Sequence, residues 1–65
     1  MNITINKLHY ELPKGATLAE AIGLWQPASP FAAAVNLQFV PKTSYGLTLL
    51  LPGDRVEIIL PVTGG

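Results

Sequence analysis

The last residues of the chain suit chemistry carried out on the main chain itself. Pro61-Val62-Thr63 leads into Gly64 and Gly65. Glycine has no Cβ atom and adopts positive φ freely, so a diglycine end fits a channel too narrow for side chains. An extended segment from Val62 to Gly65 reaches on the order of 13 Å, far enough to enter another protein's active site. We therefore expect residues 62–65 to form a flexible C-terminal tail on a domain of residues 1–61.

A carboxylate on Gly65 would need activation before it could take part in a transfer reaction. A C-terminal carboxyl group has an ordinary pKa of about 3.3–3.7, so at neutral pH it is an anion and a poor electrophile. ATP can convert it to an acyl-adenylate, from which a sulfur or nitrogen nucleophile displaces AMP. The sequence contains no paired carboxylates, no nucleophile with a base, no phosphate-binding loop and no metal-binding cluster. We expect a protein that is not itself an enzyme, binds no cofactor or metal, and relies on a partner for catalysis.

The single histidine, His9, is the remaining candidate for chemistry. The alternation around it places it on a polar face, and no Asp, Cys or second His is near it in the sequence. A catalytic or metal-binding role normally requires such a neighbour. We expect His9 to have neither role.

Composition excludes several classes of function. Among 65 residues, four basic and four acidic side chains cancel, which argues against nucleic-acid binding. The chain is 49% hydrophobic and 12% charged, yet no apolar run approaches the roughly 20 residues of a membrane span. This apolar excess fits either a dense core or a surface kept for partners. There is no cysteine for disulfides or thiolate metal sites, and no signal peptide is visible, so we expect a cytoplasmic protein.

The first half of the chain predicts a hairpin followed by a helix. Apolar residues alternate on both sides of Asn6-Lys7, which reads as the turn, and the inner face comprises Met1, Ile3, Ile5, Leu8, Tyr10 and Leu12. Thr17-Leu18-Ala19-Glu20 is a capping box that begins a helix. The helix has one apolar stripe, formed by Leu18, Ala21, Ile22 and Trp25. Gly23 weakens this helix and Pro27 ends it.

The second half predicts three more extended segments. Phe31–Val35 and Phe39-Val40 flank a turn at Asn36, and residues 43–47 can form one helical turn. Pro52-Gly53-Asp54 is a turn before the last strand, residues 55–60. We expect Val56, Ile58 and Leu60 of that strand to face the core.

The other face of the last strand carries apolar residues where water is expected. Ile59 and Pro61 share this face with Arg55 and Glu57, immediately before the tail. A single exposed aliphatic residue is ordinary, so these positions indicate either a partner interface or nothing more than normal exposure.

Together the elements predict an α+β fold of the β-grasp (ubiquitin-like) type. One helix crosses one face of a mixed sheet of four to five strands, and the other face is partly bare. Because a crossover with a helix separates the first and last strands, we expect them to be parallel neighbours.

The sequence also resembles a known family, the ubiquitin-like sulfur carrier proteins, and most closely the ThiS family of thiamine biosynthesis. The matching segments are residues 1–6, Gly15-Ala16-Thr17-Leu18, Ala34-Val35-Asn36, Phe39-Val40-Pro41-Lys42, residues 53–58 and Gly64-Gly65. Each is short, but they occur in the family's order along nearly the whole chain. The resemblance implies a β-grasp fold.

The resemblance also implies a specific role. A ubiquitin-activating-like adenylyltransferase would use ATP and Mg²⁺ to adenylate Gly65, and the carboxylate would become a thiocarboxylate. The sulfur would come from cysteine through a cysteine desulfurase and pass to thiazole synthase. Gly65 would be the modified residue, with Gly64, Thr63 and Val62 completing the tail and Ile59, Pro61 and Val62 contacting partners.

Three alternatives stay open at this point, and one of them is a plain interaction domain that uses the fold as an adaptor and makes no use of the tail. The ending Pro61-Val62-Thr63-Gly64-Gly65 resembles the MoaD family, the small subunits of molybdopterin synthase, although that family is usually longer. A ubiquitin-like protein modifier, which would join Gly65 to lysines of other proteins, shares the same activation chemistry.

Overall fold

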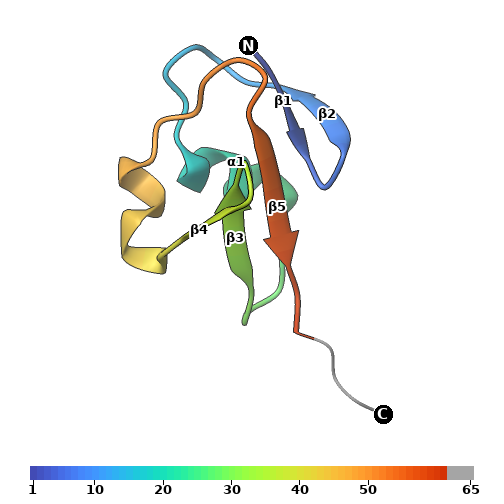
Figure 1. Ribbon diagram of the computed structural model, residues 1–65, viewed down its shortest axis with the longest axis vertical. Helices are drawn as coiled ribbons and strands as arrows, with labels where there is room; N and C mark the ends of the chain where they lie inside the picture. Colours follow the sequence, from blue (N-terminus) through green and yellow to red (C-terminus); the bar gives the residue numbers. More distant parts are fainter. Residues whose placement is uncertain (62–65) are drawn as a thin grey trace.

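The computed structural model describes residues 1–61, and the tail residues Val62, Thr63, Gly64 and Gly65 lie outside the described part. Five strands and one α-helix make up the domain (Figure 1). Their bounds are β1 Asn2–Ile5, β2 Leu8–Glu11, α1 Leu18–Trp25, β3 Ala32–Val35, β4 Gln38–Val40 and β5 Arg55–Ile59, with a short 3-10 helix, η1, at Lys42–Leu47.

The strands form one mixed sheet in the order β2-β1-β5-β3-β4. β1 and β5 are parallel neighbours, as predicted, and the β1–β2 and β3–β4 hairpins are antiparallel. β5 also pairs with β3, antiparallel, so the last strand in the chain is the central strand of the sheet. This arrangement is the predicted β-grasp.

Both predicted hairpin turns are present and have the same conformation. Asn6 and Lys7 have φ of 50° and 72°, and Asn36 and Leu37 have φ of 49° and 70°. Positive φ at both central residues is the signature of a type I′ turn, whose twist matches that of the strands it joins. Asparagine tolerates this region well, which explains the first residue of each turn but not the second.

The capping box predicted at the start of α1 is formed. The Glu20 backbone N–H donates to the Thr17 hydroxyl over 3.3 Å, and the Thr17 backbone N–H donates to the Glu20 carboxylate over 3.4 Å. Gln26 ends the helix in the left-handed region, one residue before Pro27. Of the predicted apolar stripe, Leu18 and Ala21 are fully buried, while Ile22 and Trp25 pack partly against the core.

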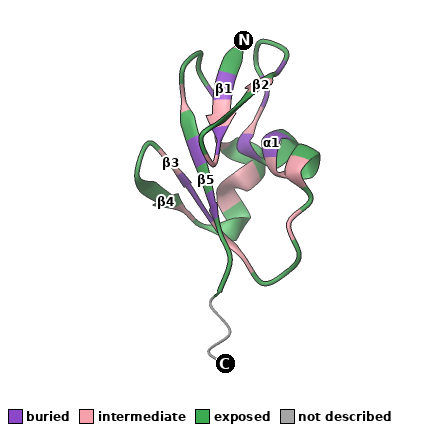
Figure 2. Ribbon diagram, turned by 90° about the vertical axis from the view of Figure 1, so that its right-hand side faces the viewer, coloured by how far each residue is buried: buried purple, intermediate pink, exposed green. Residues whose placement is uncertain are grey.

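The core lies between α1 and one face of the sheet. Its largest fully buried side chains are Ile3, Ile5, Leu18, Leu50 and Val56. In Figure 2 the buried residues, in purple, follow β1, β3, β5 and α1. We call the face of the sheet that carries Ile3, Ile5, Val56 and Ile58 the inner face, and the opposite face the outer face.

Two predicted core residues are not in the core. Leu8 belongs to the inner-face alternation of β2 but is 59% exposed, and Leu60 is 48% exposed because β5 ends at Ile59. The eight residues of α1 cover only part of the inner face, so correct alternation does not guarantee burial at the ends of strands. The predictions that Leu8 lines an aliphatic inner face and that Leu60 faces the core were therefore wrong.

Candidate partner-binding face at the end of β5

β5 is held along both edges and then leaves the sheet. On one edge it pairs with β3 as far as the Ala32–Ile59 pair. On the other edge it pairs with β1 only at Thr4–Arg55 and Ile5–Val56, because β1 turns away into the hairpin after Ile5. Figure 1 shows β5 running away from the end of the molecule where the N terminus lies, so Pro61 leaves the fold at the opposite end.

The asparagines of the two turns both bind β5 through their side chains. The Ile58 N–H donates to Asn6 Oδ1 (2.8 Å), and Asn6 Nδ2 donates to the Ile58 carbonyl oxygen (3.3 Å). On the other edge, the Arg55 N–H donates to Asn36 Oδ1 (3.0 Å), and Asn36 Nδ2 donates to the Asp54 carboxylate (3.0 Å). The two hairpins thus hold opposite ends of the same strand.

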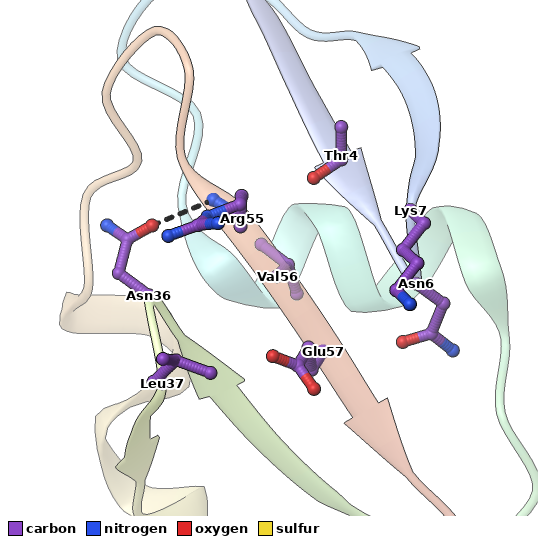
Figure 3. Close-up of a pocket in the computed structure, with 8 residues that line it drawn as sticks. All are labelled: Thr4, Asn6, Lys7, Asn36, Leu37, Arg55, Val56 and Glu57. Carbon is purple, nitrogen blue, oxygen red and sulfur yellow. Dashed lines mark hydrogen bonds between the residues drawn. The ribbon is translucent and has the colours of Figure 1, made fainter.

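The two turns also enclose a cavity on the outer face of the sheet. Figure 3 shows it between Asn6-Lys7 and Asn36-Leu37, with β5 as its floor. Its volume is about 340 Å³, and its lining contains two basic side chains, Lys7 and Arg55, and one acidic side chain, Glu57. The lining therefore carries one more positive than negative side chain.

The outer face near the end of β5 is apolar. Ile59 is 41% exposed, as predicted for a residue of the outer face, and Pro61 is also exposed. Phe39 of β4 is 73% exposed and lies opposite Ala34, which in turn lies opposite Glu57 of β5. Directly paired residues project from the same face, so Phe39 and Ile59 both point away from α1.

Leu37 and Phe39 are surface residues that the sequence interpretation missed. Leu37 is 77% exposed in a turn where its φ is unfavourable for a leucine. The signal for Phe39 was available, because a two-residue turn at Asn36-Leu37 sets Val35 opposite Gln38 and Ala34 opposite Phe39. We call Leu37, Phe39 and Ile59 the outer apolar residues.

Of the predicted site residues, Ile59 and Pro61 are brought to the exit of β5. The other predicted residues, Val62, Thr63, Gly64 and Gly65, lie outside the described part of the chain. His9 lies on the exposed edge of the sheet, where Nδ1 is 3.0 Å from Asn2 Oδ1. Within residues 1–61 no three His, Cys, Asp or Glu side chains are grouped so that they could hold a metal ion. No helix in that same part is long and apolar enough to cross a membrane.

The topology, the single crossing helix and the exposed exit of β5 define a protein of the ubiquitin-like β-grasp class. Within that class the chain belongs to the ThiS family, because the model of this family matches residues 3–65. This is a family of small sulfur carriers.

A solved structure supports the same fold. The thiamine biosynthesis protein (ThiS) from Geobacter metallireducens superposes with a TM-score of 0.82 and covers 100% of both chains at 20% sequence identity. At that identity the likeness bears on the fold alone. None of the curated proteins compared with the chain matches it.

Proposed function

We propose that the protein is a sulfur carrier of thiamine biosynthesis that works as a co-substrate of partner enzymes. An oxygen of the Gly65 carboxylate bonds to the α-phosphorus of ATP, and pyrophosphate leaves. The terminal sulfur of a persulfide on a partner then displaces AMP, and a thiol cleaves the resulting acyl disulfide, so that Gly65 carries a thiocarboxylate and the two partner sulfurs form a disulfide. The sulfur goes on to the forming thiazole ring.

The family match that runs from residue 3 to Gly65 carries this proposal. The match includes Gly64 and Gly65, whose lack of side chains suits a tail that enters a narrow active site. The fold adds a second support, since β5 is the central strand of the sheet and is followed closely by the exposed Pro61. Residues 62–65 act as the arm, and residues 1–61 act as the body that the partner grips.

The partners follow from the chemistry. A ubiquitin-activating-like adenylyltransferase binds ATP and Mg²⁺ and receives the tail, a cysteine desulfurase supplies sulfur, and thiazole synthase accepts it. Ile59, Pro61 and Val62 form the contact surface nearest the tail. Phe39 extends that surface across the outer face, because aromatic residues contribute most to the central contacts of an interface.

The test is intact mass spectrometry after incubation with ATP, Mg²⁺, the activating enzyme and a sulfur source. The expected product has one oxygen replaced by sulfur on its last residue. Removing Gly65, or adding one residue after it, is expected to abolish the mass change while leaving binding to the activating enzyme intact. A truncated chain that still supports thiazole formation would refute the proposal.

The ending Pro61-Val62-Thr63-Gly64-Gly65 favours a second candidate, sulfur donation to the molybdenum cofactor by a molybdopterin synthase. Offering the thiocarboxylate form separately to thiazole synthase and to a molybdopterin synthase large subunit decides between the two acceptors. A protein modifier would give a third result, branched Gly-Gly on lysines of other proteins.

A further inference from the structure

The Asn6 side chain completes the edge of the sheet at the point where β1 stops. In the parallel pair, the Asn6 N–H donates to the Val56 carbonyl oxygen (2.9 Å), and this is where the backbone of β1 leaves β5. One step further along β5, Ile58 presents its N–H and C=O to the same edge. The Asn6 amide group satisfies both, with distances of 2.8 and 3.3 Å. A primary amide carries the same donor and acceptor as a peptide, so Asn6 replaces the next residue of a longer β1.

Losing this contact should cost more free energy than losing an exposed hydrogen bond. Both bonds between Asn6 and Ile58 are partly buried. Without the amide, the polar backbone of Ile58 faces a partly buried edge with no protein partner in the described residues. β5 would then be held there by β3 alone, and Ile58 lies only three residues before Pro61, where the chain leaves the fold.

We propose that Asn6 is a positioning residue that fixes the direction in which the tail leaves β5. This inference rests on the proposed function, because direction matters only if the tail enters a partner. When the Asn6 contact is absent, the end of β5 samples several directions, and only part of the population presents the tail correctly. The apparent affinity for the partner falls by that fraction, whereas the chemical step after entry is unchanged.

Two matched substitutions test this role. Asn6→Gly keeps the turn, because glycine accepts the φ of 50° at this position, and removes only the amide. Asn36→Gly does the same at the φ of 49° in the second turn, and it removes the contacts to Asp54 and Arg55 at the far end of β5. The two variants lose similar numbers of side-chain hydrogen bonds from equivalent turns, but only one of them is next to the tail.

The first measurement is amide hydrogen exchange of the free protein. Asn6→Gly is expected to accelerate exchange of the Ile58 N–H at least about tenfold beyond any change in global unfolding, because the opening is local. The second is ATP–pyrophosphate exchange by the activating enzyme at increasing carrier concentrations. The half-saturating concentration is expected to rise about 5–10-fold for Asn6→Gly, with a maximal rate within about twofold of the unaltered protein.

The results separate the two proposals. An unchanged half-saturating concentration for Asn6→Gly, or an equal rise for Asn36→Gly, overturns the positioning role and leaves the carrier function standing. Unchanged exchange of the Ile58 amide overturns it as well. If the unaltered protein supports no ATP–pyrophosphate exchange, the proposed function itself fails, and the positioning role fails with it.

Discussion

Ile59 lies directly opposite Ala32 in the antiparallel pairing of β5 with β3, and both side chains project from the outer face. The neighbouring Ile58 projects from the inner face and is buried in the core. The two adjacent isoleucines therefore have different roles. Ile58 stabilises the core, and Ile59 lies at the surface.

We expect Ile59→Asp to weaken binding to the activating enzyme at least about tenfold, because a charge would be placed in the apolar contact surface next to the tail. The free energy of unfolding should change by about 1 kcal/mol or less, as is usual for partly exposed positions. Titration calorimetry with the enzyme and thermal denaturation of the free protein measure the two effects. Ile58→Asp is the control and should prevent folding; collapse of the Ile59→Asp variant instead would show that the faces are assigned wrongly.

Leu37→Gly is expected to stabilise the protein and weaken partner binding. A residue with a Cβ in the left-handed region costs about 1–2 kcal/mol. Glycine removes this strain, but it loses about 0.5–1 kcal/mol more conformational entropy on folding than leucine does. The free energy of unfolding should therefore rise by roughly 0.5–1 kcal/mol. Urea denaturation measures the gain. Partner binding should weaken because the substitution removes one of the outer apolar side chains, which is 77% exposed.

Lys7→Gly provides the matched control, since Lys7 has almost the same φ in the equivalent turn. It should give the same gain in stability with no loss of partner binding, because Lys7 lies on the other side of β5 from Phe39. A loss of stability in both glycine variants would contradict the strain argument.

Thr17→Ala should lower the free energy of unfolding by about 1 kcal/mol, because it removes the hydroxyl that caps α1. The short helix depends on its cap and its packing, since eight residues are too few to be helical alone. Thr17→Ser keeps the hydroxyl and should restore most of the loss. Equal unfolding midpoints for the alanine and serine variants would exclude a contribution from the cap.

His9→Ala should leave sulfur loading unchanged. His9 is exposed and its one side-chain hydrogen bond in the described residues is with Asn2, so stability should change by less than about 0.5 kcal/mol. Intact mass spectrometry of the loaded protein checks the first expectation. A variant that folds normally but fails to acquire sulfur would assign His9 a role that its surroundings do not explain.

The local features of the fold could be predicted from the sequence because they depend on neighbouring residues. The turns at Asn6-Lys7 and Asn36, the capping box at Thr17 and the alternation of Ile3 with Ile5 all have local causes. The parallel pairing of β1 and β5 followed from the order of the elements. The outward position of Ile59 also followed from the alternation of side chains along a single strand.

The contacts that depend on how elements end could not be predicted. Leu8 is exposed because α1 is too short to cover it, and no local pattern in residues 8–12 contains that information. The Asn6–Ile58 contact joins residues 52 positions apart. It forms because β1 ends at Ile5, which leaves the backbone N–H and C=O of Ile58 without a partner from the backbone of β1. Asn6 looks like a turn residue in the sequence, and its second role becomes visible only when the strands are paired.

The central place of β5 in the sheet also has a consequence for synthesis of the protein. A nascent chain that has emerged only as far as Asp54 leaves β1 and β3 with no strand between them, so neither hairpin can join the other. The pairings of β5 with β1 and β3 can therefore form only after residues 55–59 have been synthesised. Under the proposed function, a nascent chain without β5 would offer the activating enzyme neither the complete sheet nor the exposed Ile59.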